Sequence, residues 1–292
     1  MYVYPIGVIY VEQYTFSQPG YYNKGISYVE CRVQESSPVH RYVALFYEAE
    51  QIRADASFPV IPDGCIDMVI SYVQGHCMGI SICGSITSMY RMTMENADYF
   101  FGMRFRPGCC PFLKNASALE LLDSQELVRM SDLDYSFAFK LMSAKNFAER
   151  IALTSQYVCR AADRLLYTRD PGRSNIVDYA VEEICRTDGN ISIRQISADM
   201  VYSSRYLETV FKAETGFTPK YMSRIIRANH AVTLLLAADG KNRTEVSAEC
   251  GYSDLSHMNR ELKGILGLNS ARISIHDFLY SITDKKTVVY KF

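Results

Sequence analysis

Two segments in the second half of the chain place polar side chains at helical spacing beside an apolar stripe. The polar residues are Ser204, Arg205, Glu208, Thr209 and Lys212 in the first segment, and Ser256, His257, Asn259, Arg260 and Lys263 in the second. These types suit nucleic acid, because Arg matches guanine, Asn matches adenine, Glu matches cytosine, and Ser or Thr suits bases or phosphate. Arg205 and Glu208 are three residues apart, so they can enter one groove together or pair with each other.

Each polar set belongs to the second helix of a predicted helix-turn-helix, one over 193–212 and one over 245–263. The second helices also carry apolar residues at helical spacing, namely Tyr206, Leu207, Val210 and Phe211 in the first copy and Leu255, Met258 and Leu262 in the second. We expect the small apolar residues of the preceding helices to let the two helices cross closely. These residues are Ile196 and Ala198 in the first copy and Val246 and Ala248 in the second.

Both predicted turns end in Tyr-Ser, at Tyr202-Ser203 and Tyr252-Ser253. Gly251 supplies the positive φ that such a turn often needs, whereas Val201 occupies the matching point of the first copy. Ser203 and Ser253 are expected to accept hydrogen bonds from free amides at the start of the second helix.

A helix beginning at Pro219 is predicted between the two copies, with an apolar stripe and a positive face. About 20 helical residues span about 30 Å, and successive major-groove faces on one side of B-DNA lie about 34 Å apart. One chain can therefore reach two neighbouring groove segments. Lys220 and Arg224 are the predicted phosphate contacts, in a cluster that also contains Arg227, Lys241 and Arg243 with Asp239 opposing them; the alternative is a merely solvated helix face.

The stretch ending near Phe278 resembles the DNA-binding domain of AraC/XylS-type transcription regulators. The matching residues are Tyr202-Ser203, Leu207, Phe211-Lys212, Glu214-Thr-Gly216, Thr218-Pro219, Tyr221, Ala248, Gly251-Tyr-Ser-Asp254, Ser256-His257, Arg260, Lys263 and Gly267. The resemblance implies two helix-turn-helix units joined by a long helix and bound to promoter DNA. Carried over by position, the base readers are Arg205, Glu208, Thr209, Leu255, Ser256, His257, Asn259 and Arg260.

This chain departs from the family pattern in its second copy. Met258 and Leu262 stand where the family often has Phe, and Asn269-Ser-Ala-Arg-Ile273 replaces a Pro followed by Tyr-Arg. We therefore expect the second unit to pack or to bind DNA less well than the family pattern implies.

The first third of the chain reads as short strands separated by turn signals, which indicates a sandwich or barrel. The predicted strands are Tyr2–Val11, Tyr42–Tyr47, Met68–Val73, Gly79–Ile86 and Tyr99–Arg106. In the last of these, Phe101, Met103 and Phe105 share one face, and Phe100, Gly102, Arg104 and Arg106 share the other.

Helical periodicity begins after the strands. Ala118–Leu122 is predicted as a short helix, and Ser124 as the cap of a further turn that includes Leu127. A long helix is predicted over 146–167, with a seam of Phe147, Ile151, Thr154, Val158, Ala161 and Leu165. That seam either lies on the sheet domain or forms a dimer contact.

The front half resembles the cupin-like N-terminal region of one AraC-type subgroup, over roughly residues 40–135. The resemblance is carried by Ile61-Pro-Asp-Gly-Cys-Ile-Asp67 and Phe101-Gly-Met-Arg-Phe-Arg-Pro-Gly108, and it implies effector sensing or dimerisation. Asp67, Arg104 and Arg106 are the candidate effector site, because guanidinium groups bind carboxylate or phosphate. The alternative is an internal pair between these arginines and Asp63 or Asp67.

Composition excludes several classes of protein. Apolar residues make up 48% and charged residues 22% of the chain, which fits a globular protein. A net charge of −1 gives no overall attraction to nucleic acid, so DNA binding depends on local charge. The sequence shows no run typical of a membrane helix or secretory signal, and nine cysteines without C-x-x-C spacing indicate a reducing cytoplasm.

The sequence offers little for catalysis or metal binding. It contains no nucleophile elbow, Walker loop or G-x-G-x-x-G, and His40 and His76 are isolated from other candidate ligands. Cys109-Cys110 is read either as packing or as a sensor of thiol-reactive agents or soft metals. No catalytic residue, metal or cofactor is therefore predicted.

Together these patterns predict an α+β protein with a β-rich, cupin-like N-terminal barrel with flanking helices and an all-α C-terminal domain. The predicted bounds are 1–170, 174–280 and a tail over 281–292, with a linker at Arg169–Ser174.

We expect a cytoplasmic, sequence-specific transcription regulator that binds double-stranded promoter DNA under control of an effector or of homodimerisation. If it is an activator, the commoner behaviour in the family, RNA polymerase is a partner. The alternatives are a cupin-type metal-dependent enzyme and a protein–protein adaptor with a degenerate helical domain.

Overall fold

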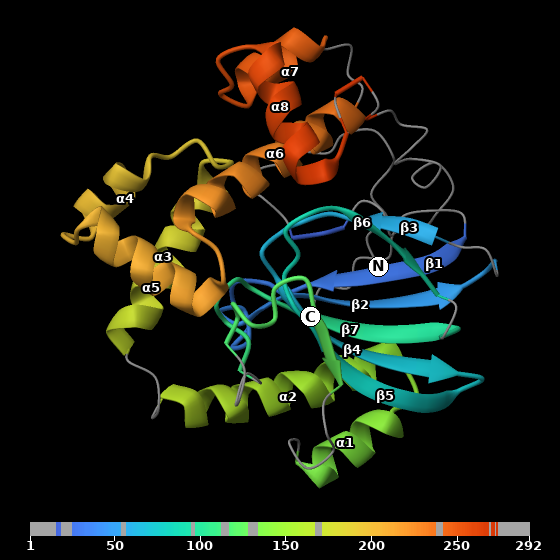
Figure 1. The fold of residues 1–292 in the computed structure, drawn as a ribbon. Helices are drawn as coiled ribbons and strands as arrows, with labels where there is room; N and C mark the ends of the chain where they lie inside the picture. The colour runs from blue at the N-terminus through green and yellow to red at the C-terminus, as the bar shows by residue number, and fades with distance from the viewer. Residues whose placement is uncertain are drawn as a thin grey trace.

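The protein consists of a β-rich N-terminal part and a helical C-terminal part (Figure 1), which confirms the predicted fold class. The computed structural model describes residues 16–18, 25–53, 57–94, 97–111, 117–127, 134–166, 171–237, 242–268, 270–271 and 273. The predicted strand over Tyr2–Val11 and the tail over 281–292 lie outside these residues.

The N-terminal part is built from two antiparallel sheets. Its strands are β1 (Ile26–Arg32), β2 (Val43–Gln51), β3 (Ser57–Val60), β4 (Ile66–Val73), β5 (His76–Cys83), β6 (Tyr90–Thr93), β7 (Tyr99–Phe105) and β8 (Gln125–Leu127). Six strands form one sheet in the order β1-β2-β7-β4-β5-β8, and β3 pairs with β6 in a second. The predicted strands from Tyr42 onward are confirmed, with shifted ends.

The predicted alternation along β7 is confirmed by the two cores on either side of the large sheet. Phe101, Met103 and Phe105 pack in the core that contains helices α1 (Tyr135–Met142) and α2 (Phe147–Leu166). Phe100 packs on the opposite face with Phe58 of β3. Figure 1 shows the large sheet between the β3–β6 pair on one side and α1 and α2 on the other.

The seam of the long helix lies on the sheet, which is the first of the two alternatives. Phe147, Ile151 and Val158 belong to the core beneath β7, and Thr154 is fully buried with its hydroxyl donating to the Arg150 carbonyl. These side chains are consequently not available to a second copy of the chain.

The prediction for 118–127 is wrong in both of its elements. Residues 118–123 form turns, and Gln125–Leu127 is strand β8, paired with Ser81–Cys83 at the edge of the large sheet. The apolar spacing in this segment favours a helix, but pairing with an open sheet edge supplies backbone hydrogen bonds that a single helical turn does not.

The C-terminal part contains six helices among the described residues. They are α3 (Pro171–Arg186), α4 (Ile193–Asp199), α5 (Ser204–Thr215), α6 (Pro219–Ala237), α7 (Arg243–Glu249) and α8 (Leu255–Leu266). Both predicted helix-turn-helix units are present, as α4–α5 and α7–α8, with α6 between them. Helix α3 starts inside the predicted linker, because proline fits the first helical turn.

Each second helix begins at a side-chain cap. The Ser203 hydroxyl accepts from the Tyr206 amide at 3.2 Å, as predicted. In the second unit the prediction for Ser253 is wrong, since Asp254 accepts from the His257 amide at 2.7 Å and Ser253 donates to the Asp254 carboxylate. The His257 amide bond lowers the pKa of Asp254, so this cap stays charged.

Serines, rather than the predicted alanines, stand where the helices of each unit meet. Ala198 and Ala248 are exposed, whereas Ser197 and Ser247 are buried. The Ser197 and Ser204 hydroxyls lie 2.9 Å apart and link α4 to α5. A serine is small enough for a close helix contact, and in the first unit it also supplies a hydrogen bond there, whereas the buried Ser247 hydroxyl has no partner among the described residues.

The two turns share a left-handed residue but differ in its type. Gly251 has φ +73°, and a Cβ there would lie 2.3 Å from Asn190 Oδ1. Val201 has φ +60° and is 90% exposed. A β-branched residue in this region is strained by about 1–2 kcal/mol, and its exposed side chain gains little packing in return.

We predict that Val201→Gly stabilises the protein by about 1 kcal/mol, because glycine removes the clash of the Cβ with the backbone. The free energy of unfolding from urea titrations would measure the gain. The control is Gly251→Ala at the equivalent turn, which should destabilise the protein. Destabilisation by Val201→Gly would contradict the strain.

Candidate nucleic-acid interface

Four of the five predicted polar residues of α5 lie on its solvent-exposed side, and the fifth, Ser204, is half-buried against Ser197. Arg205, Glu208, Thr209 and Lys212 are exposed, while Leu207, Val210 and Phe211 are buried as predicted. Tyr206 departs from the predicted stripe, since it is 40% exposed and stacks at a tilt on Tyr202. In the described part of the chain no ion pair joins Arg205 to Glu208.

The polar residues of α8 are more engaged with the protein itself. Ser256, Arg260 and Lys263 are exposed, and Leu255 is half-buried. His257 lies edge-on to the Tyr252 ring with Nδ1 3.2 Å from the Ser253 hydroxyl. Asn259 Oδ1 accepts from the Ser270 amide at 2.9 Å, so this side chain also holds the segment after α8.

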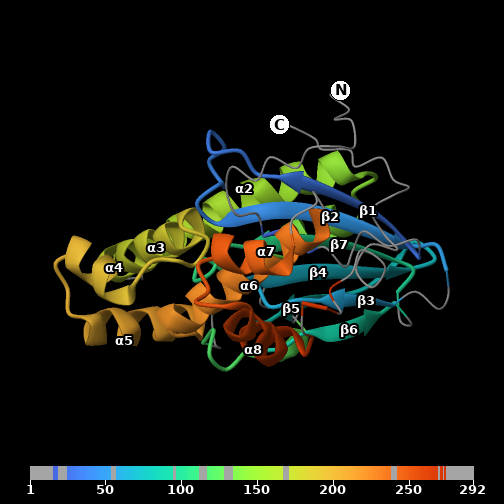
Figure 2. The same cartoon turned by 90° about the horizontal axis from the view of Figure 1, so that it is seen from above.

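Helix α6 joins the two units and has the predicted apolar stripe. Ile225, Ala228, Val232 and Leu236 are buried in the cores of the helical part. Figure 2 shows α5 and α8 along one edge of the molecule, with α6 connecting them. The two second helices are therefore on the same side of the fold.

Glu261 is an organising residue that the sequence reasoning missed. Its buried carboxylate lies 3.0 Å from Arg224 Nε and 3.3 Å from Arg227 Nε, and it accepts from the Tyr252 hydroxyl at 3.0 Å. Burial and this carboxylate raise the pKa of Tyr252, so its hydroxyl stays a donor. A carboxylate within the apolar stripe of α8, three residues after Met258, was the available signal.

A groove of about 830 Å³ lies between the two units. It is lined by Gly189, Asn190, Ile191, Ser192, Ile193, Lys220, Ser223, Arg224, Arg227, His257, Arg260 and Glu261. Four of these side chains are cations and one is an anion, so the groove is positive in a chain of net charge −1. It gathers Lys220, Arg224, His257 and Arg260 of the predicted site; Lys241 and Asp239 lie outside the described residues.

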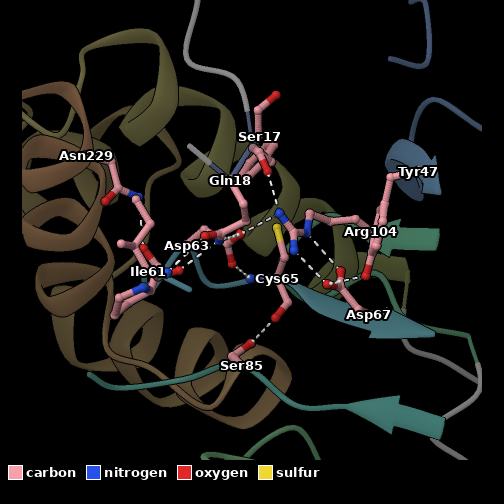
Figure 3. A network of polar contacts seen from close by, with 12 residues as sticks. Ser17, Gln18, Tyr47, Ile61, Asp63, Cys65, Asp67, Ser85, Arg104 and Asn229 are labelled. Carbon is pink, nitrogen blue, oxygen red and sulfur yellow. Dashed lines mark hydrogen bonds and ion pairs between the residues drawn. The ribbon is translucent and has the colours of Figure 1, made fainter. Parts of the chain in front are cut away.

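The predicted effector residues divide into two environments. Arg104 is buried and pairs with Asp67 at 2.6 Å and with Asp63 at 3.2 Å, which is the internal-pair alternative (Figure 3). Tyr47 also donates to Asp67 at 3.1 Å. Burial raises the pKa of Asp63, and the Arg104 cation opposes that shift.

Arg106 has no such carboxylate among the described residues. Its Nη2 lies 2.7 Å from His40 Nε2, and its guanidinium stands 6.0 Å from the Phe16 ring centroid. Its Nε atom is buried without a hydrogen-bond partner. Burial and the Arg106 cation lower the pKa of His40, so the imidazole is neutral and accepts from the guanidinium.

Six of the nine cysteines are buried, and Cys77, Cys83 and Cys159 are half-buried. Cys109 and Cys110 are buried, and Cys109 Sγ lies 3.7 Å from an Asp178 carboxylate oxygen. Cys65 and Cys185 are buried in one core, and burial raises the pKa of Cys185 to about 12. Within the described ranges no three His, Cys, Asp or Glu side chains gather in a metal-binding group, and no described helix is long and apolar enough to cross a membrane.

Comparison with known proteins gives two domain matches. A helix-turn-helix domain family matches residues 196–271, and a domain of unknown function (DUF6597) matches residues 32–126. No curated protein matches the chain.

Several solved structures are similar to the chain. The C-terminal domain of AraT, a response regulator from Geobacillus stearothermophilus, is 18% identical with a TM-score of 0.31, over 36% of this chain and 84% of that one. ToxT from Vibrio cholerae O395 is 10% identical with a TM-score of 0.39, over 90% and 100%. Unsaturated fatty acid bound ToxT from Vibrio cholerae strain SCE256 is 9% identical with a TM-score of 0.36, over 91% and 97%.

The domain match covers α5–α8 and most of α4, the same two units that the sequence motifs and the caps define. The C-terminal part of this chain thus belongs to the AraC-type helix-turn-helix domains, with which transcription regulators bind DNA.

Proposed function

We propose that the protein is a sequence-specific regulator of transcription that reads promoter DNA with α5 and α8. The observation that carries this proposal is the pair of helix-turn-helix units at the two ends of α6, with both second helices along one edge (Figure 2). The 19 residues of α6 span about 29 Å, close to the separation of about 34 Å between successive major-groove segments.

In this proposal α5 supplies most of the base recognition. Arg205 and Glu208 are exposed and not paired with each other in the described structure, so both can turn to base edges such as guanine and cytosine. Thr209 and Lys212 follow on the same side, and Ser204 supports the helix start through Ser197. Tyr202 and Tyr206 add exposed hydroxyls that suit phosphate.

Helix α8 contributes a second, more limited set of contacts. Ser256, Arg260 and Lys263 are exposed and suit bases or phosphates. His257 contacts Ser253 through its Nδ1 atom, and Asn259 accepts from the Ser270 amide through its Oδ1 atom. Because Oδ1 is used in this way, Asn259 offers its Nδ2 amide to DNA. We therefore propose that a larger share of the contacts made by α8 than of those made by α5 goes to the DNA backbone.

The positive groove between the units would receive the phosphates between the two major-groove contacts. Lys220 is exposed at its edge, and Arg224 and Arg227 are held in place by Glu261. Fixed cations lose little side-chain entropy on binding, which favours phosphate contact over a merely solvated face.

We predict that Arg205→Ala weakens binding to the preferred DNA site by about 1–3 kcal/mol and relaxes the base choice at one position. Lys220→Ala should instead weaken binding to all sequences and reduce the salt slope by about one unit. Fluorescence anisotropy with duplexes selected from a random-sequence library, at several salt concentrations, would measure both effects.

Arg186→Ala is the matched control, because this exposed arginine of α3 pairs with Glu183 and lies outside the groove. Its binding should equal that of the unmodified protein. Failure of the unmodified protein to select any sequence would contradict the proposed function and favour the adaptor alternative.

Control by a small anionic effector is the second part of the proposal. Of the three predicted effector residues, we keep Arg106 as the candidate. Asp67 and Arg104 satisfy each other, whereas Arg106 has only a neutral imidazole as its polar partner in the described structure. A half-buried guanidinium is stabilised by a carboxylate or phosphate. Effector binding would favour one of two arrangements of the DNA-binding part. The proposal also includes three further parts: the protein activates transcription through RNA polymerase, it forms a homodimer, and it is located in the cytoplasm.

We predict that inorganic phosphate or a member of a panel of small monocarboxylates raises the unfolding temperature of the protein. At 100 times its Kd such a ligand stabilises the fold by about 2.7 kcal/mol. Arg106→Met should abolish the shift, while Arg41→Met, which removes an exposed arginine paired with Asp178, should retain it. An equal shift with Arg106→Met, or no shift with any member, would exclude this site.

A further inference from the structure

The segment Ile61–Cys65, here called the PDG loop, takes part in the cores of both helix-turn-helix units. Ile61 is 3% exposed and packs in the core formed by the second half of α6 with α7 and α8. Cys65 is 5% exposed and packs in the core formed by α3, α4, α5 and the first half of α6. One short loop of the β-rich part thus joins two cores of the helical part.

The PDG loop also contacts α6 directly at two points. Asn229 Nδ2 donates to the Pro62 carbonyl at 2.8 Å, in a buried position. A Cβ on Gly64, which has φ +79°, would lie 2.3 Å from Met222 Cε. Met222 and Asn229 are seven residues apart, which is two helical turns on one face. The loop therefore lies along the middle of the helix that separates the units.

A buried polar network fixes the shape of the PDG loop (Figure 3). The Gln18 amide donates to the Ile61 carbonyl at 2.8 Å and accepts from the Ile61 amide at 2.9 Å. Asp63 accepts from Gln18, from the Cys65 amide and from Arg104, which also holds Asp67. The loop is consequently a rigid part of the β-rich domain rather than a flexible connection.

Two further hydrogen bonds join the β-rich domain to α6 and to α8. The Tyr221 hydroxyl of α6 donates to the Thr87 carbonyl at 2.8 Å. The Met89 amide donates to the Ile265 carbonyl of α8 at 3.2 Å. The β-rich domain therefore contacts the linking helix and the second unit at once.

We propose that the PDG loop is a positioning element of the DNA site: it fixes the separation and relative rotation of α5 and α8, and so sets which spacing of half-sites the protein reads. This proposal rests on the proposed function. Ile61 and Asn229 are positioning residues in this role, because they act on DNA through α6 and the two cores.

The DNA test uses the full chain and a duplex selected from a random-sequence library by the unmodified protein. Base pairs are then added or removed between its two half-sites. Each one shifts a half-site by about 3.4 Å and about 35°, so binding by the unmodified protein should fall about tenfold or more per step. Asn229→Ala and Ile61→Ala should flatten this dependence to about threefold while retaining the base preference within each half-site.

Thr233→Ala is the matched control, since among the described residues its hydroxyl bonds within α6, to the Asn229 carbonyl, and its spacing profile should not change. If Ile61→Ala fails to fold, Asn229→Ala decides the test alone. An unchanged spacing profile in Asn229→Ala would overturn the positioning role while leaving DNA binding intact.

A distance measurement tests the same proposal without DNA. Spin labels on unnatural amino acids at Ala213 of α5 and Gly264 of α8, both exposed, would report the separation of the units by electron spin resonance. We expect a narrow distance distribution in the unmodified protein and a broad one in Asn229→Ala and Ile61→Ala. Equal widths would overturn the proposal even if the protein selected no DNA sequence.

Discussion

The arrangement of this molecule depends on one buried cation, the guanidinium of Arg104. It lies between the carboxylates of Asp63 and Asp67 and also donates to the Phe16 carbonyl. Removing charges from water is costly, so such a group is tolerated only where every partner is in place. Its partners stand on β4 and in the PDG loop, which means that the pair orients the loop that contacts α6. A cluster of three charged groups inside the β-rich domain thus holds the loop that contacts the helix between the two helix-turn-helix units.

Local signals were sufficient to predict the helical part of the fold. Ser203 as a cap, Gly251 at a left-handed turn and Pro219 at a helix start each act within a few residues of the chain, so each is readable from the sequence. The alternation of apolar residues along β7 was equally local, and both of its faces match the two cores. The apolar stripe of α5 predicts which face of the helix is buried, and the polar residues on the remaining face were therefore predicted to be exposed.

The remaining features depend on residues far apart in the sequence. Strand β8 replaced a predicted helix because β5 offered it a free edge. The choice between an effector site and an internal pair for Arg104 depended on how close β4 and β7 lie. Asn259 and Glu261 face tertiary partners, Ser270 and α6, that no local pattern reveals. Sequence reasoning therefore predicted which side chains of α5 are exposed better than it predicted the contacts that hold the helices in place.

The burial of Cys65 and Cys185 in one core has a practical consequence. This core contains side chains from both halves of the protein, and burial keeps the two thiols protonated and shielded from electrophiles. Alkylating reagents should reach them only when this core opens, either because the two halves part or because a helix unfolds locally. The rate at which these two sulfurs are modified therefore measures how often this core opens, and the measurement requires no engineered probe.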